Sequence, residues 1–266
     1  MKVNNQAEYL ECLKKVKSVV VNVNGTADKE ADEEEIAVVH EHFMDLVVNE
    51  RLVAKLVCTP ANLTELVLGR LMTEGMISGI EDVESIYICE FGSTAKVFLK
   101  KDIVFRNTME NEPTCCTGNQ ILLKNVQVDE LQRLPKTEWK KEWIFGLANE
   151  FSGGSKIHKI TKGTHGCYLG VKGDIVFACE DIGRHNALDK AVGFAVMKGY
   201  KPDECILFTT GRVPTDMVKK AVVARIPVLV SKAVPTDAAV EMAKAYNLTL
   251  ICRAWPDRYE IFNEAE

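Results

Sequence analysis

The sequence lacks the features that place a chain in a membrane or direct it out of the cell. None of its apolar runs approaches the roughly 18 residues that a helix needs to cross a bilayer. The N-terminal stretch MKVNNQAEYLECLKK has no apolar core of the signal-peptide kind. We therefore expect a cytoplasmic protein with no membrane partner. Its net charge of -5 argues against a general nucleic-acid binder.

Common metal and nucleotide motifs are absent as well. There is no C-x-x-C pair and no H-x-E pair, so a zinc ribbon or a zinc deaminase is not expected. The chain has no G-x-x-x-x-G-K-[ST] loop, no G-x-G-x-x-G turn and no G-x-S-x-G elbow. We therefore expect no intrinsic metal ion and no standard phosphate-binding loop.

Cysteine occurs nine times, and an odd number without a secretion signal indicates reduced thiols rather than a disulfide framework. Two of them differ from the rest: Cys115 and Cys116 stand side by side in the polar stretch NEPTCCTGNQ, residues 111–120. That stretch could hold a disulfide, half of a metal site or a reactive thiol. Six others lie in or at the ends of apolar runs, where cysteine acts as a small buried hydrophobe. They are Cys58, Cys89, Cys167, Cys179, Cys205 and Cys252.

Composition and pattern divide the chain into three parts. Residues 1–36 are expected to form an N-terminal arm, which includes the acidic run ADKEADEEE, residues 27–35. Residues 37–135 are expected to form a smaller β-rich subdomain, with the cysteine loop at 107–120. Residues 136–266 are expected to form an α/β subdomain that binds a cofactor.

Turn residues and apolar periodicity predict the elements inside these parts. Two strands turn at Asn49-Glu50, and a helix with Asn62 as its cap follows them. A later helix ends at Gly153-Gly154. Beyond it come a hairpin that turns at residues 172–174, and then apolar strands that alternate with helices. This alternation predicts an α/β fold with a largely parallel sheet covered on both faces.

Polar residues gather where the strands of the second subdomain end. In open α/β sheets, ligands bind beyond the carboxyl ends of the strands. The stretch EDIGRHNALDK follows one predicted strand, and shorter polar groups follow later ones. The candidate cofactor-binding residues are His165, Asp181, Gly183, Arg184, His185, Asn186, Lys190, Gly211, Arg212, Ser231, Pro235, Thr236, Cys252, Arg253, Asp257 and Arg258.

The chemistry that these groups suit is anion binding. Arg184, Arg212 and Arg253 could each grip a phosphate with two hydrogen bonds. Helices predicted to begin at the same edge would point free N–H groups at the ligand. A phosphorylated cofactor with several anionic groups fits better than a small neutral substrate. The alternative is that these groups are caps and ion pairs, such as Asp181 with Arg184, that only hold the fold.

Several stretches of the sequence resemble the FdhD/NarQ family of sulfur carrier proteins. EDIGRHNALDKAVG resembles the family's E-D-x-G-R-H-N-A-x-D-K signature, and TPANLTELVLGRLMTEGMI resembles its T-P-x-D-L-x-x-L-x-x-G-x-L-x-x-E-G-x-I segment. KGTHGC is similar to the T-G-x-H-x-A stretch. The region from TTGRVPTDMVKKA to LTLICRA follows the family's C-terminal pattern in order and spacing. The resemblance covers nearly the whole chain.

The resemblance implies a fold, an activity and partners. The C-terminal part is expected to be similar to the cytidine deaminase fold without its zinc ligands. A loop cysteine is expected to take sulfane sulfur from a cysteine desulfurase as a persulfide. It would then deliver that sulfur to a molybdenum or tungsten bis-pterin guanine dinucleotide cofactor, which enters formate dehydrogenase, the client enzyme. The family resemblance also implies a homodimer.

The cysteine loop departs from the family pattern S-C-G-x-C-G. If Cys115 matches the first cysteine, Gly118 stands in the second place, and if Cys116 matches, Asn119 does. We favour Cys116 as the carrier, with Cys115 as the alternative, because its flanking residues match the family's T-x-C-x-G context. Adjacent cysteines make a strained disulfide ring and lack the spacing of metal ligands, so reactive sulfur remains.

Two other functions compete with sulfur transfer. The chain could be a chaperone that binds the pterin cofactor without any sulfur chemistry. It could also be a deaminase-like nucleotide hydrolase, although only fold analogy suggests this.

Overall fold

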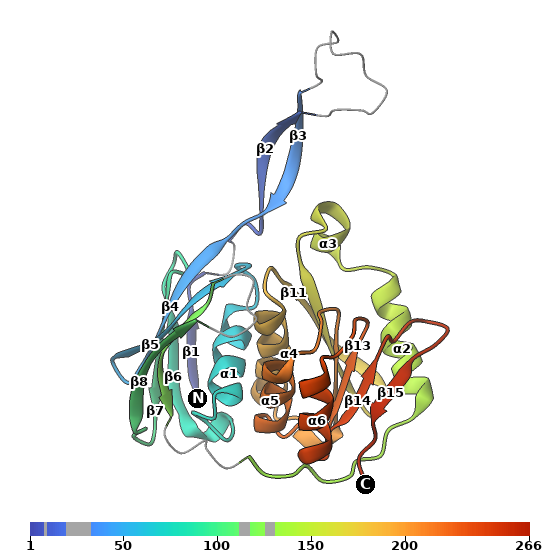
Figure 1. The fold of residues 1–266 in the computed structure, drawn as a ribbon. Helices are drawn as coiled ribbons and strands as arrows, with labels where there is room; N and C mark the ends of the chain where they lie inside the picture. The colour runs from blue at the N-terminus through green and yellow to red at the C-terminus, as the bar shows by residue number, and fades with distance from the viewer. Residues whose placement is uncertain (8–9, 20–32, 112–117, 126–130) are drawn as a thin grey trace.

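The computed structural model describes residues 1–7, 10–19, 33–111, 118–125 and 131–266. The predicted carrier residues Cys115 and Cys116 lie outside the described residues. The described chain is a mixed α/β structure with two large sheets and a separate two-stranded ribbon. Helices lie between the two large sheets, as Figure 1 shows.

The first large sheet has seven strands in the order β1-β6-β7-β4-β5-β9-β8. The hairpin predicted at Asn49-Glu50 is confirmed, since β4 and β5 pair antiparallel and both turn residues have positive φ, 44° and 66°. Two successive left-handed residues are what a tight hairpin turn requires. The strands are β1 (Lys2–Asn5), β4 (His42–Val48), β5 (Arg51–Cys58), β6 (Val83–Ile88), β7 (Thr94–Leu99), β8 (Phe105–Asn111) and β9 (Gln120–Asn125).

The second large sheet has six strands in the order β11-β10-β12-β13-β14-β15. Only β12, β13 and β14 run parallel, so the prediction of a largely parallel sheet is wrong for the outer strands. The reason is that β10 and β11 form the predicted hairpin, and β15 returns beside β14 without a crossover helix. The strands are β10 (His165–Val171), β11 (Asp174–Asp181), β12 (Cys205–Thr209), β13 (Val228–Ser231), β14 (Thr249–Cys252) and β15 (Glu260–Asn263).

Helices cover both faces of the second sheet, as the sequence predicts (Figure 1). α4, α5 and α6 face the first sheet, and α2 packs on the opposite face through Ile144, Leu147 and Ala148. No helix of the described residues is both long and apolar enough to cross a membrane. The helices are α1 (Leu63–Thr73), α2 (Lys141–Ser152), α3 (Lys156–Thr161), α4 (Arg184–Lys198), α5 (Thr215–Val223) and α6 (Asp237–Ala245), with 3-10 turns η1 (Ile80–Asp82) and η3 (Pro202–Glu204).

The helices α1 and α4 cross so closely that each needs glycine at the contact. A Cβ atom added at Gly69 would lie 1.6 Å from the Asp189 carbonyl oxygen, and one at Gly193 would lie 1.8 Å from that of Glu65. The crossing joins the two predicted subdomains, and one apolar core continues through it from sheet to sheet. At the start of α1, Asn62 makes no side-chain cap bond, because its backbone is left-handed (φ 54°) rather than extended.

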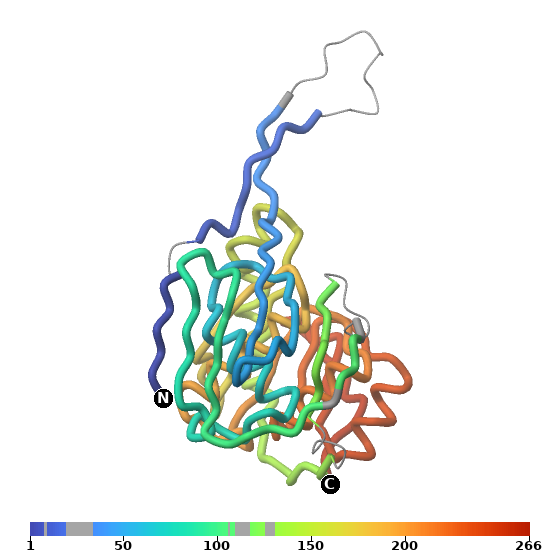
Figure 2. The backbone as a smooth tube through the Cα atoms, turned by 90° about the vertical axis from the view of Figure 1, so that its left-hand side faces the viewer, coloured from blue at the N-terminus to red at the C-terminus, as the bar shows by residue number. Residues whose placement is uncertain are grey.

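A two-stranded ribbon stands away from the rest of the chain, as Figures 1 and 2 show. It consists of β2 (Leu13–Val19) and β3 (Glu33–Val39), paired antiparallel. The two strands carry opposite charge, and Lys15 lies 3.7 Å from the Glu35 carboxylate. The arm expected over residues 1–36 includes neither of these strands as a prediction, because LKKVKSV and EEEIAVV show no regular alternation of apolar and polar residues.

Candidate functional site

A cavity of about 540 Å³ lies at the edge of the second sheet where β12 ends and β10 begins. Segments that follow β13 and β14 and the short helix α3 complete its wall. This is the sheet edge at which the strand order predicts a ligand site. The lining residues are Phe151, Ser155, His158, Lys162, Gly163, Thr164, His165, Gly166, Ile182, Thr210, Lys232, Ala233 and Trp255.

Two aromatic rings and one lysine form part of the cavity wall. The Lys232 ammonium lies 4.9 Å from the centre of the Phe151 ring and 4.6 Å from that of the Trp255 ring. The two rings belong to distant segments, since Phe151 ends α2 and Trp255 follows β14. A cation held over two ring faces is stabilised by their electron-rich surfaces. Trp255 is 38% exposed, so the part of its ring surface that Lys232 does not cover can stack on a flat ligand.

The described lining of the cavity carries positive charge without a carboxylate. Its ionisable residues are Lys162, Lys232, His158 and His165. Burial and the nearby guanidinium of Arg184 lower the pKa of His165, so its imidazole is neutral near pH 7. The two lysines therefore set the sign of the charge, which favours an anionic ligand.

Glu180 holds the short helix α3 at the rim of the cavity. Its carboxylate accepts hydrogen bonds from the N–H groups of Ile157 and His158, both at 2.8 Å, and from the Thr164 hydroxyl at 2.9 Å. Burial opposes ionisation, but these donors outweigh it and keep the pKa of Glu180 below its ordinary value. Glu180 belongs to the EDIGRHN stretch but is not among the candidate cofactor-binding residues predicted from the sequence.

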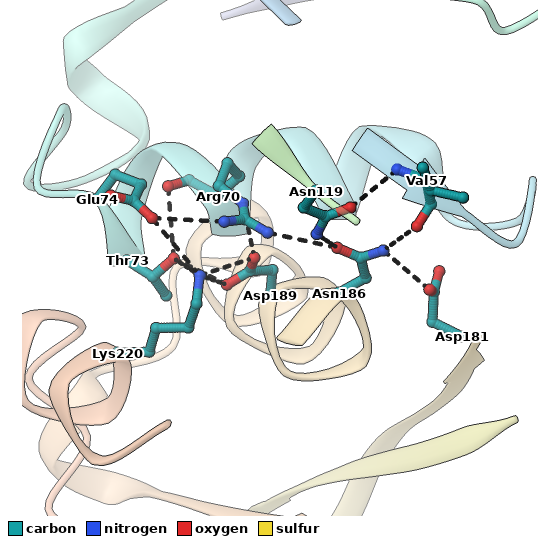
Figure 3. Close-up of polar contacts among 9 residues, drawn as sticks. All are labelled: Val57, Arg70, Thr73, Glu74, Asn119, Asp181, Asn186, Asp189 and Lys220. Carbon is teal, nitrogen blue, oxygen red and sulfur yellow. Dashed lines mark hydrogen bonds and ion pairs between the residues drawn. The ribbon is translucent and has the colours of Figure 1, made fainter. Parts of the chain in front are cut away.

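A second polar assembly lies buried between the two sheets, and we call it the buried polar network. It joins the end of β5, α1 and the residue before β9 from one predicted subdomain to β11, α4 and α5 of the other (Figure 3). Its members are Val57, Thr59, Arg70, Thr73, Glu74, Asn119, Asp181, Asn186, Asp189, Lys190 and Lys220.

One half of the network is centred on Asp189, whose side chain is fully buried. The Arg70 guanidinium lies 2.9 Å from its carboxylate, and the Lys220 ammonium lies 3.1 Å away. The Thr73 hydroxyl donates to the same carboxylate at 2.8 Å. Two buried cations thus share one buried anion, with Glu74 at the margin of the cluster, 3.8 Å from Lys220.

The other half is centred on Asn186 and Asp181. The Asn186 amide donates to the Val57 carbonyl at 2.8 Å and to the Asp181 carboxylate at 3.0 Å. Its oxygen accepts from the Asn119 amide at 2.8 Å. Asp181 forms an ion pair with Lys190 at 2.7 Å, with both side chains buried. Figure 3 shows Val57, Asn119, Asp181 and Asn186 meeting beside α1 and α4.

The structure therefore divides the predicted cofactor residues between these two places. His165 lines the cavity. Arg184 packs against Gly211, the residue after the cavity-lining Thr210, since a Cβ atom at Gly211 would lie 2.8 Å from the Arg184 side chain. Asp181, Asn186 and Lys190 lie in the buried polar network.

Other predicted residues shape the loops around the cavity. The Ser231 hydroxyl donates to the Gly211 carbonyl at 2.7 Å and accepts from the Ala233 N–H at 2.9 Å. Thr236 caps α6 by accepting from the Ala239 N–H.

Three more of them make contacts within the fold. The Gly183 N–H donates to Asp181 at 2.9 Å. His185 lies 3.0 Å from the Asp216 carboxylate. Pro235 lies in a strand-like bridge with Val213.

Four predicted residues are exposed outside the described cavity wall: Arg212, Arg253, Asp257 and Arg258. Of these, Arg253 forms an ion pair with Glu260 at 3.2 Å. Cys252 is buried, and burial raises its pKa to about 12, so its thiol is not ionised near pH 7.

The described cysteines confirm most of the sequence prediction. Five of the six assigned to apolar runs are buried: Cys58, Cys167, Cys179, Cys205 and Cys252. The sixth, Cys89, is only partly buried in the turn after β6. Burial opposes its ionisation, but bonds from the Ser93 hydroxyl and nearby backbone N–H groups lower the pKa of Cys89 overall. The prediction of a buried thiol is wrong there, because the turn leaves the side chain at the surface.

Three comparisons relate the chain to known proteins. The model of the FdhD/NarQ family matches residues 39–266. The sulfur carrier protein FdhD of Listeria monocytogenes serotype 4b is 28% identical over 238 residues, covering 87% of this chain and 91% of the relative. That of Thermoplasma acidophilum is 32% identical over 215 residues, covering 78% and 76%.

A solved structure shares the fold. The crystal structure of a putative formate dehydrogenase accessory protein from Desulfotalea psychrophila matches with a TM-score of 0.76 at 24% identity. The match covers 95% of this chain and 97% of that one.

Proposed function

The chain belongs to the FdhD/NarQ family, and we propose that it is a sulfur carrier. In this proposal, it accepts sulfane sulfur from a cysteine desulfurase as a cysteine persulfide. It then transfers the sulfur to the molybdenum or tungsten bis-pterin guanine dinucleotide cofactor that formate dehydrogenase requires. The cofactor is cargo, held only while it is sulfurated.

The observation that carries the proposal is the cavity at the edge of the second sheet. A dinucleotide cofactor presents flat rings joined by phosphates. Trp255 and Phe151 offer ring faces, and Lys162 and Lys232 offer positive charge with no carboxylate in the described lining. The volume of about 540 Å³ suits the nucleotide end of such a ligand. Arg184, beside His165, adds a further cation near the wall.

The sulfur transfer itself needs only a thiol that a donor protein can reach. The thiolate of Cys116, or of Cys115, attacks the outer sulfur of the donor's persulfide. A new S–S bond forms, the donor's S–S bond breaks, and the donor cysteine leaves as a thiolate. Delivery as sulfide takes two electrons, which a second thiol supplies by forming a disulfide with the carrier cysteine.

Two features of the proposal come from the family resemblance: a homodimer, and a cytidine deaminase-like architecture for the second sheet and its helices. A cytoplasmic location is a third feature, and it comes from the sequence pattern alone. Helices on both faces of that sheet are compatible with such an architecture.

The test is to incubate the protein with a cysteine desulfurase and cysteine and then to measure intact mass. We expect a gain of one sulfur atom that Cys116→Ala abolishes, while Cys115→Ala retains it. Cys89→Ala is the matched control, because Cys89 is the partly exposed thiol with a lowered pKa in the described chain. Sulfur on Cys89 alone, or none at all, contradicts the proposal.

The second candidate is a cofactor chaperone without sulfur chemistry. The cavity favours it equally, since no described cysteine lines that wall. The Cys115→Ala/Cys116→Ala double variant separates the two functions in a strain that lacks the native protein. Restored formate dehydrogenase activity would identify a chaperone, and lost activity with an intact fold would identify a carrier.

A further inference from the structure

Asn119 is a buried polar residue just before β9. Its side chain is fully buried, whereas its neighbours Gly118 and Gln120 are exposed. The Asn119 oxygen accepts from the Val57 N–H at 2.8 Å, and its amide donates to Asn186 at 2.8 Å. A polar side chain buried beside exposed neighbours and satisfied on both sides is a fixed anchor.

This anchor connects to the segment that lines the cavity. Asn186 is bound to Asp181, and Asp181 accepts from the Gly183 N–H at 2.9 Å. Between them lies Ile182, which lines the cavity and donates its N–H to the Thr59 hydroxyl at 3.0 Å. Three hydrogen bonds thus join Asn119 to the two residues that flank Ile182.

Chain length relates the same anchor to the carrier thiol. An extended chain covers at most about 3.5 Å per residue, so three residues span at most ~11 Å. Cys116 precedes Asn119 by three residues in the sequence. The fixed position of Asn119 therefore sets the centre of the region that the thiol can reach.

We propose that Asn119 is a positioning residue for sulfur delivery, fixing the tether of the carrier thiol relative to the cofactor cavity. The inference rests on the proposed function. Asn119 makes and breaks no bond in the transfer. It acts through Asn186, which belongs to the EDIGRHN stretch, and thereby gives that buried residue a role in delivery rather than in ligand contact.

The test separates loading of sulfur from its delivery. Loading is the mass gain with desulfurase and cysteine. Delivery is the rate at which the loaded protein loses that sulfur to formate dehydrogenase carrying unsulfurated cofactor, with a small thiol as reductant. We expect Asn119→Ala to load at the wild-type rate and to deliver at least about tenfold more slowly, because small misplacements of reacting groups are costly.

The matched control is Asn125→Ala, at the far end of β9, the strand that begins directly after Asn119. The Asn125 amide donates to the Gly75 backbone carbonyl at 2.7 Å, so this variant also removes a side-chain hydrogen bond that ties β9 to another segment. We expect this variant to load and deliver at wild-type rates. Equal slowing of delivery in both variants assigns the effect to general weakening of β9 and overturns the inference.

A second variant keeps the test decisive if Asn119→Ala does not fold. Two glycines inserted between Gly118 and Asn119 lengthen the tether without changing the Asn119 side chain or its partners Val57 and Asn186. The longer tether should load normally and deliver slowly. Wild-type delivery by this variant overturns the inference alone, whereas a wild-type chain that takes up no sulfur overturns the proposed function and the inference with it.

Discussion

The buried polar network and the cavity differ in whether their charged groups are paired with opposite charges. In the network, each charged group meets a partner of opposite sign, as Asp189 does with Arg70 and Lys220. In the cavity, the described lining offers lysines and histidines and no carboxylate. The first region is closed to solvent and balanced in charge. The second is open and positive.

This difference distinguishes charged residues that stabilise the fold from charged residues that are available to bind a ligand. A buried charge that is already paired with an opposite charge is not available to bind a ligand. Loss of its partner leaves an ion in a medium of low dielectric constant, which is destabilising. A charge without an opposing group gains most from an anionic ligand. Substitutions in the two regions should therefore separate stability from binding.

The largest expected effect is on stability, from Asp189→Asn. This change removes the charge of the anion that Arg70 and Lys220 share, and it leaves the more distant Glu74 carboxylate, at 3.4 and 3.8 Å, to oppose both buried cations. We expect a loss of about 3–5 kcal/mol in the free energy of unfolding, measured by urea denaturation. Asp45→Asn is the control, since the exposed Asp45–Lys55 pair should contribute at most about 1 kcal/mol. Similar losses from both would remove the distinction between the network and the surface.

An intermediate effect is expected on binding, from Trp255→Ala. We expect the affinity for guanosine diphosphate, measured by calorimetry, to fall by about 1–3 kcal/mol because one stacking face is lost. The unfolding free energy should stay near that of the wild type, since Trp255 is 38% exposed. Phe91→Ala is the control, because that exposed ring lies outside the cavity wall. A large loss of stability without a loss of affinity would assign Trp255 to the fold.

Much of the fold follows from local sequence signals. The turn at Asn49-Glu50 and the helix ending before Gly153 depend on residues adjacent in the chain, and the structure confirms both. The antiparallel β15 could not be predicted in the same way. Its pairing with β14 depends on how the intervening residues reverse the chain, which local propensity does not determine.

The site was less predictable because its parts meet only in three dimensions. The EDIGRHNALDK stretch shows many polar side chains, but their partners Val57, Thr59 and Asn119 come from distant segments. The sequence alone could not show that Asn186 and Lys190 are buried. Phe151 and Trp255 gave no signal either, since an aromatic residue beside an apolar run resembles ordinary core.

The smallest expected effect is on the pH dependence of stability, from Glu180→Gln. Glu180 lies at the cavity rim, but its carboxylate is fully engaged in hydrogen bonds, as the residues of the buried polar network are. Its bonds to Ile157, His158 and Thr164 hold its pKa below the ordinary value of 4.5, so the folded state binds a proton less readily than the unfolded state. The stabilisation is complete above that ordinary value and is lost as pH falls through it towards the folded pKa. We expect Glu180→Gln to lower the melting temperature at pH 7. As the pH is lowered below the ordinary pKa of a glutamate, the melting temperature of this variant should fall less steeply than that of the wild type. Thermal unfolding at several pH values measures both effects.

The control for this prediction is Glu84→Gln, a substitution of an exposed carboxylate on β6. It should leave both stability and the acid decline unchanged. An unchanged acid decline in Glu180→Gln would show that the donors from α3 do not favour the ionised carboxylate. A loss of nucleotide affinity in Glu180→Gln with stability retained at pH 7 would place Glu180 with the cavity, because α3 then serves the ligand more than the fold. Loss of stability with affinity retained would assign Glu180 to the buried polar network, together with its neighbour Asp181. The cavity lining would then begin at Ile182 in the EDIGRHN stretch.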